Sequence, residues 1–196
     1  MEKLVREHRS IFYFMQPGTV FRKFRARNGK EVILRTPRLE DLEDLMELIN
    51  SLVEEKAEIA RAEKVTREEE VEWLPKMLTN LEKDELFFLV AEVDNKLVAS
   101  SDIHILHGGE QHVGVLGIVV SNGFRDSGIG TEMMNTLMRQ ASDLGLKVLT
   151  LNVFATNKRA IHVYEKVGFL ETGRVPMKHF REGQYIDEVI MTNLIE

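Results

Sequence analysis

The chain has 196 residues, which suits one compact domain with a substantial buried core. It contains no cysteine and its six histidines show no zinc spacing, so we expect no disulfide, no cysteine nucleophile and no metal site. Twenty-six basic and thirty-two acidic side chains give a net charge of −6, which disfavours a nucleic-acid partner and favours a cationic one.

The first segment, residues 1–18, shows no clear period and ends in the turn signal Gln16-Pro17-Gly18. We expect an N-terminal extension there and a single domain over residues 19–196. No apolar run approaches the ~20 residues that span a bilayer, and the run from Ile11 to Met15 is too brief for a signal sequence. The sequence therefore favours a cytoplasmic protein with no membrane partner.

A hairpin is expected to open the domain, because Asn28-Gly29 separates the strand-like runs Val20–Arg27 and Glu31–Arg35. Apolar residues spaced by three and four then predict a helix from Thr36 to between Ser51 and Glu55. A polar link follows. The capping-box pattern at Thr66–Glu69 starts a second helix that reaches about Leu81, with Pro75 bending or interrupting it.

The second half alternates strands and helices. Two hairpin strands and a third strand precede a glycine-bearing turn, and a strand–helix crossover after it implies one parallel pair. We expect an α/β fold of the α+β type, with a mixed, mostly antiparallel sheet flanked by helices. The predicted strands are 86–93, 96–105, 111–120, 147–154, 169–175 and 185–195, and the helices are 131–144 and 157–166.

The glycine-bearing turn is the place where we expect chemistry. Gly128 and Gly130 remove two Cβ atoms where a helix begins, so backbone N–H groups can approach an anion closely. Arg125 adds a positive charge, and the helix dipole favours a pyrophosphate. A P-loop would need Gly-Lys-Ser/Thr and a dinucleotide fingerprint a third glycine, and the sequence has neither.

The segment Arg-Asp-Ser-Gly-Ile-Gly, from Arg125 to Gly130, resembles the Arg/Gln-x-x-Gly-x-Gly/Ala signature of the GNAT superfamily of N-acetyltransferases. A second motif from Asn157 to Phe169, Asn-x-x-Ala-Ile-x-x-Tyr-Glu-Lys-x-Gly-Phe, stands at the distance typical of that family. The detailed resemblance covers about residues 86–195. It implies the acyl-CoA N-acyltransferase fold, acetyl-CoA (coenzyme A) as cofactor, and direct transfer of acetyl to an amine without an acyl-enzyme.

The resemblance also implies which residues bind the cofactor. The main chain at the end of strand 111–120 would pair with the pantetheine amides, and N–H groups of the turn would hold the pyrophosphate. Asn157 would contact the pantetheine or phosphate arm, although its position equally suits a helix N-cap. The implied set is Ile118, Val119, Val120, Arg125, Asp126, Ser127, Gly128, Ile129, Gly130, Thr131, Asn157 and Tyr164.

Tyr164 stands at the family's position for the general acid that protonates the departing thiolate. The sequence does not identify the general base. Asn152 replaces the Glu typical of enzymes that acetylate protein N-termini, and Gly114 and Leu116 occupy the strand positions where other members carry Glu or His. His112, Glu110 and an ordered water relay are the three alternatives.

The acceptor is expected to be a small or peptide-borne primary amine. Glu54, Glu55 and Glu58 lie in the link that the family uses as a wall of the acceptor site, and they favour a polyamine unless they form only a solvated face. A free amino acid belongs to the same expectation, and acetylation of a protein lysine or of a protein N-terminus is the enzymatic alternative. A catalytically silent acyl-CoA-binding sensor is the other, and either a monomer or a homodimer fits the sequence.

Overall fold

A computed structural model describes residues 15–195, which form an eight-stranded sheet in the order β1-β2-β3-β4-β5-β6-β8-β7. The strands are β1 (Val20–Arg25), β2 (Glu31–Arg35), β3 (Leu86–Val93), β4 (Lys96–Ile105), β5 (Val113–Val120), β6 (Val148–Phe154), β7 (Leu170–Arg181) and β8 (Gln184–Leu194). The helices are α1 (Leu42–Glu54), α2 (Arg67–Glu82), α3 (Ile129–Asp143) and α4 (Lys158–Lys166), with 3₁₀ turns η1 (Leu39–Asp41), η2 (Gly108–Glu110) and η3 (Asn122–Phe124).

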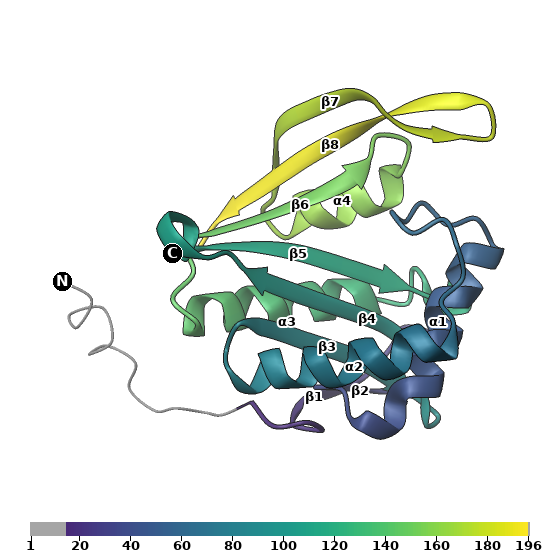
Figure 1. Cartoon of the computed structure of the whole chain (residues 1–196), viewed down its shortest axis with the longest axis vertical. Coiled ribbons are helices and arrows are strands. Elements are labelled where there is room, and N and C mark those ends of the chain that lie inside the picture. Colours follow the sequence, from purple (N-terminus) through teal and green to yellow (C-terminus); the bar gives the residue numbers. More distant parts are fainter. Residues whose placement is uncertain (1–14, 196) are drawn as a thin grey trace.

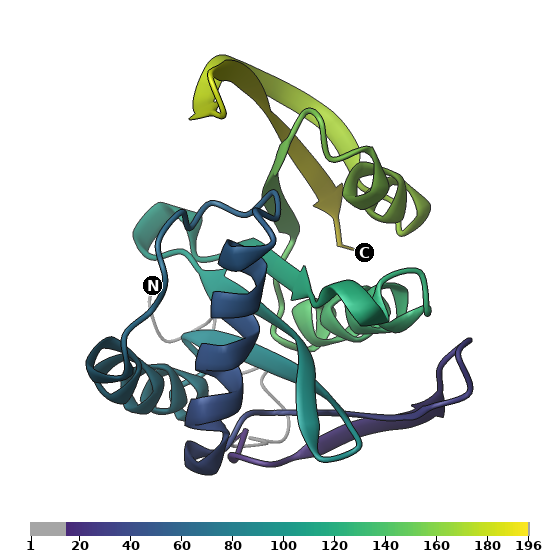
Figure 2. The same ribbon diagram turned by 90° about the vertical axis from the view of Figure 1, so that its right-hand side faces the viewer.

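The predicted fold class is confirmed. Among the described strands only β5 and β6 pair in parallel, and the other neighbours are antiparallel. Helices α1 and α2 cover one face of the sheet, and α3 and α4 cover the other (Figure 2). Apolar side chains of the central strands and of the facing helices form one continuous core between these layers.

The parallel pair is short, and this decides where the site lies. Pairing runs only from Val113 with Val148 to Val115 with Thr150. Beyond it the two strands diverge (Figure 1), and β6 continues by pairing with β8 as far as Phe154. The rest of β5, Leu116–Val120, therefore has no strand partner on its β6 side among the described residues.

Two sequence expectations differ from the structure. Helix α2 runs through Pro75 without interruption, because Pro75 lies on the exposed face, where water can satisfy the carbonyl that its missing N–H leaves free. Strand β7 extends to Arg181 rather than ending at Val175, and it passes through an irregularity that includes Met177 at a φ of +53°.

The expected N-terminal extension lies largely outside the described residues. Its last part packs on the domain: Met15 is buried, and the Thr36 hydroxyl donates to the Gln16 carbonyl at 2.7 Å. No helix within residues 15–195 is long and apolar enough to cross a membrane.

Gly114 allows the short parallel pair to pack tightly. A Cβ built there would lie 2.6 Å from Ile103 Cγ2, 2.8 Å from Leu149 Cδ2 and 2.9 Å from Leu146 Cδ1. We expect Gly114→Ala to lower the free energy of unfolding by about 1–3 kcal/mol through overpacking, measured by urea denaturation. Gly109→Ala, where a Cβ meets nothing within 4 Å, is the control. An unchanged urea midpoint in the Gly114 variant would contradict this packing.

Candidate active site

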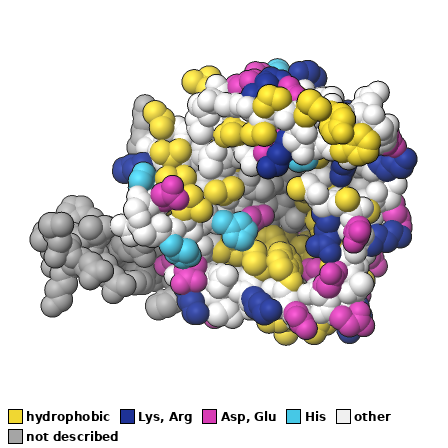
Figure 3. All heavy atoms as spheres, turned by 45° about the horizontal axis from the view of Figure 1, so that its top comes forward, with side chains coloured by type: hydrophobic (Ala, Val, Ile, Leu, Met, Phe, Trp, Pro, Cys, Tyr) yellow, Lys and Arg dark blue, Asp and Glu magenta, His cyan; other side chains and the backbone are white. Residues whose placement is uncertain are grey.

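A cavity of about 1050 Å³ fills the opening between the diverging strands. Its walls come from the second half of β5, the start of α3, the end of β6, α4 and the loop between α1 and α2. Figure 3 shows the molecule hollowed in this region, with apolar side chains on the lower wall and charged side chains along the right-hand edge.

The start of α3 presents free backbone donors to the cavity. Gly128, at a φ of +90°, is the N-cap and supplies no side-chain cap. The N–H groups of the first helical turn have no acceptor within the helix. A Cβ at Gly130 would meet nothing closer than Val120 Cγ2 at 3.8 Å, so the glycine leaves room above the helix start. An uncapped, open helix start fits a pyrophosphate.

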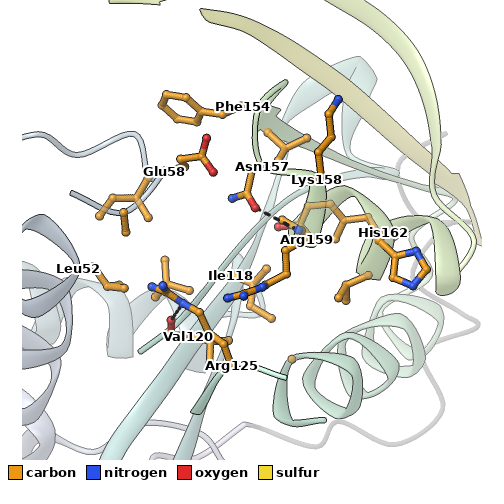
Figure 4. Close-up of a pocket in the computed structure, with 18 of the residues that line it drawn as sticks. Leu52, Glu58, Ile118, Val120, Arg125, Phe154, Asn157, Lys158, Arg159 and His162 are labelled. Carbon is orange, nitrogen blue, oxygen red and sulfur yellow. Dashed lines mark hydrogen bonds between the residues drawn. The ribbon is translucent and has the colours of Figure 1, made fainter. Parts of the chain in front are cut away.

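Two arginines flank this helix start. Arg125 donates through Nε to the Val120 carbonyl at 3.0 Å and forms an ion pair with Glu55. Arg159 of α4 pairs with Asp126 at 3.3 Å. Figure 4 shows both guanidinium groups beside Ile118 and Val120, with that of Arg125 directed toward the Val120 carbonyl. The positive charge expected at Arg125 is therefore partly neutralised within the chain.

The free edge of β5 runs along the cavity next to these charges. Ile118, Val119 and Val120 line it, and their main chain lacks a strand partner on this side. An extended chain with amide groups can pair with such an edge as an added strand. The pantetheine arm of coenzyme A has this chemistry.

Tyr164 lies on α4 and lines the same cavity. The side chain is buried, and burial raises the pKa of its phenol to about 12 because the phenolate would lose hydration. The phenol therefore keeps its proton at neutral pH and is available as a donor to a group in the cavity.

The other predicted cofactor residues take several positions. Asp126, Gly128, Gly130, Thr131 and Asn157 line the cavity. Asn157 also caps α4, because its side-chain oxygen accepts from the Ala160 N–H at 3.1 Å. Ser127 and Ile129 are buried outside the cavity lining, and the Ser127 hydroxyl donates to the Phe124 carbonyl.

The expected base and acceptor residues are not all brought together. Glu55 and Glu58 line the cavity, whereas Glu54 does not and pairs with Lys64 at 2.5 Å. Glu110 and His112 are exposed near the start of β5, outside the cavity lining and at the opposite end of that strand from the glycine turn.

A histidine–carboxylate pair at the other end of the cavity was not singled out by the sequence. His179 Nε2 and Glu188 Oε2 lie 3.0 Å apart, both half-buried, and the imidazole stacks on Phe154 with ring centroids 4.0 Å apart. Their meeting depends on the irregular register between β7 and β8, which sequence spacing does not reveal. The pair can exchange a proton with a group in the cavity.

The α1–α2 loop closes the opening by contacts to the C-terminal hairpin. Arg181 of β7 donates to the carbonyls of Ala57 at 2.5 Å and Ile59 at 2.7 Å. Lys56 pairs with Glu182 at 2.5 Å, and the Thr156 hydroxyl donates to Glu58. This loop therefore forms a wall that is held from across the cavity.

Arg181→Met should loosen this wall. Hydrogen bonds from a charged group are worth about 1.5–3 kcal/mol, so the closed loop should be populated less and the acceptor KM should rise by roughly tenfold. Acetyl-CoA affinity should change little, because the glycine turn is untouched. Arg174→Met, which removes an exposed arginine from the same strand, is the matched control. Equal acceptor KM values in both variants would show that the Arg181 contacts do not shape the site.

Comparison with known proteins places this geometry in a family. The profile of the Acetyltransferase (GNAT) family matches residues 45–169. YwnH of Bacillus subtilis, which carries a provisional name as a phosphinothricin acetyltransferase, is 28% identical over 161 residues, 81% of this chain and 96% of that protein. The L-amino acid N-acetyltransferase AaaT of Escherichia coli is 29% identical over 54% of this chain and 67% of its own. A GNAT acetyltransferase structure from Streptococcus pneumoniae superposes with a TM-score of 0.76 at 25% identity, covering 84% of this chain and 99% of that one.

The chain belongs to the GNAT acetyltransferase family. It is an acetyl-CoA-dependent acetyltransferase that acts on an amino group, as the two motifs predicted.

Proposed function

We propose that this acetyltransferase transfers the acetyl group of acetyl-CoA to the primary amine of a small α-amino acid. One observation carries the catalytic part: a single cavity holds the free edge of β5, the uncapped start of α3 and the phenol of Tyr164. These are a partner for pantetheine, a site for pyrophosphate and a proton donor.

Acetyl-CoA supplies an activated acyl group as its thioester. In the net reaction a C–N bond forms, the C–S bond breaks with its electron pair on sulfur, sulfur gains one proton and the ammonium group loses two. Tyr164 supplies the proton to sulfur, since a thiolate that leaves into a low-dielectric cavity is costly without a donor within ~3 Å. The first-turn N–H groups of α3 hold the phosphates.

Two observations support an amino acid over a polyamine. Phosphinothricin is an α-amino acid, and AaaT is named for L-amino acids. In this chain Glu54 already pairs with Lys64 and Glu55 with Arg125, while Glu58 accepts from Thr156. The acidic segment that favoured a polyamine is thus largely engaged within the protein.

Steady-state thiol release from acetyl-CoA with a panel of acceptors tests the proposal. The panel contains L-amino acids, an uncharged monoamine, spermidine and a short peptide with a lysine and a free N-terminus. We expect the highest kcat/KM with an L-amino acid. If spermidine or the peptide reacts faster than every amino acid, the proposed acceptor class is wrong.

A further inference from the structure

A second cavity of about 420 Å³ lies on the other side of the α1–α2 loop, between α1, α2 and strands β3–β5. Ile59 and Ala60 of the loop line both cavities, and so do Gly117, Ile118 and Val119 of β5. The two cavities therefore meet along the part of β5 whose edge is free. A molecule in the second cavity can reach this strand without passing through the space that coenzyme A would occupy.

Glu70 of α2 lines this second cavity and is only 5% exposed. No hydrogen bond or ion pair to its carboxyl group is recorded within residues 15–195, although a buried carboxylate is normally paired. Burial raises its pKa to about 7, the nearby Arg61 opposes this rise, and the adjacent Glu69 adds to it. The group is half-ionised near neutral pH and can take up or release a proton.

The remaining walls supply one cation and an aromatic surface. Arg61 lines the cavity and is about half exposed, and it donates to Glu69 at 3.0 Å. Trp73 and Phe88 meet edge to face with centroids 5.7 Å apart. Asp102 of β4 also lines the cavity, but its carboxylate is held by His104 at 2.9 Å. Among residues 15–195, Glu70 is thus the carboxyl group in this lining that has neither a hydrogen-bond partner nor an ion-pair partner.

We propose that the second cavity receives the acceptor as an α-amino acid with an apolar side chain, and that Glu70 is the general base. In this step an N–H bond of the ammonium group breaks, its electron pair stays on nitrogen, and the proton passes to a Glu70 carboxylate oxygen and then to solvent. The amine nitrogen then attacks the thioester carbon at β5, where the two cavities meet, and its second proton replaces the one that Tyr164 gives to sulfur. Arg61 binds the acceptor carboxylate, and Trp73 and Phe88 contact the side chain. This inference rests on the proposed function.

The pH dependence of kcat/KM tests whether Glu70 is the general base. Glu70 must be ionised to accept a proton, so kcat/KM should rise with pH through about 7 and level above it. Arg61 and Glu69 act electrostatically on Glu70, and Asp102, which pairs with His104, lines the same cavity; the variant that follows removes none of them. The level region should extend to the higher pH at which the free amino acid itself loses its ammonium proton.

Glu70→Gln keeps the shape of the side chain and removes the base. With L-leucine we expect kcat/KM to fall by about 10²-fold and the rise near pH 7 to disappear, while acetyl-CoA affinity stays unchanged. Glu72→Gln is the same change two residues along α2 on an exposed side chain, and it should behave as the parent. Because the folded protein favours the neutral acid, the free energy of unfolding falls as the pH rises from the pKa of Glu in the unfolded chain to about 7. The Gln variant should therefore unfold at a higher temperature than the parent above pH 7.

Carboxylate recognition is tested with L-leucine and 3-methylbutylamine, which is the same molecule without the carboxylate. Arg61→Met should raise the KM for L-leucine several-fold and leave that for the amine unchanged. A parent enzyme that acetylates only spermidine or peptides would refute the amino-acid function itself. If the parent uses amino acids, parental kcat/KM and a parental pH profile in Glu70→Gln would overturn the role of Glu70. Its role would also be overturned if the rise of kcat/KM near pH 7 were lost in Glu188→Gln and kept in Glu70→Gln.

Discussion

Tyr164→Phe should lower kcat by about 10²-fold or more and leave acetyl-CoA affinity nearly unchanged. Phenylalanine keeps the ring that packs in the core 6.2 Å from Phe169, so the fold and the cavity shape should persist. Only the phenolic proton is lost, and that proton is needed when the C–S bond breaks. Steady-state kinetics together with calorimetric titration of acetyl-CoA separates the two quantities.

A parental kcat in Tyr164→Phe would mean that water or another group protonates the thiolate. Tyr185→Phe is the matched control, because Tyr185 is 62% exposed and does not line the cavity. It loses the same hydroxyl group and should keep the parental rate.

Gly130→Asp should weaken acetyl-CoA binding by well over tenfold, which corresponds to more than ~1.4 kcal/mol. The new side chain would project over the open helix start and bring a negative charge to the place where the pyrophosphate needs positive potential. Calorimetric titration of the folded variant measures the effect.

Gly109→Asp makes the same chemical change in the η2 turn, where a Cβ meets nothing within 4 Å and no cavity wall is involved. Its affinity should match that of the parent. Unchanged acetyl-CoA affinity in Gly130→Asp would remove the start of α3 from the cofactor site.

Local signals in the sequence were sufficient for most elements. Asn28-Gly29 predicted the first hairpin, and the spacing of apolar residues predicted α1 and α3. The parallel pair was predicted from the crossover, but its length was not. Pairing of β5 with β6 ends at Val115 and Thr150, while each strand continues with its other neighbour, and no local pattern encodes that divergence. Met177 lies at positive φ inside the register shift of β7, and its N–H donates to the Asp187 carboxylate of β8, a cross-strand contact that no local pattern encodes.

The site was predicted unevenly for the same reason. The two motifs led to Gly130, Asn157 and Tyr164, which line one cavity. His179 and Glu188 meet only through the register of a twisted hairpin, so their sequence spacing gave no warning.

Glu70 could have been found. It stands four residues before Leu74 on the stripe that continues through Met77, Leu78 and Leu81, and all of these are buried. An acid on an apolar helical stripe is expected to be buried, whereas the candidate acids Glu54, Glu55 and Glu58 were taken from the link before this helix.

The most direct test of acetyl transfer in this cavity follows thiol release and N-acetylated product in the same reaction with acetyl-CoA and an L-amino acid. The product is identified by mass spectrometry. We predict one N-acetyl amino acid for each thiol released, with both falling together in Tyr164→Phe. Thiol release without an acetylated amine, or binding of acetyl-CoA with no thiol release for any acceptor, would contradict the account.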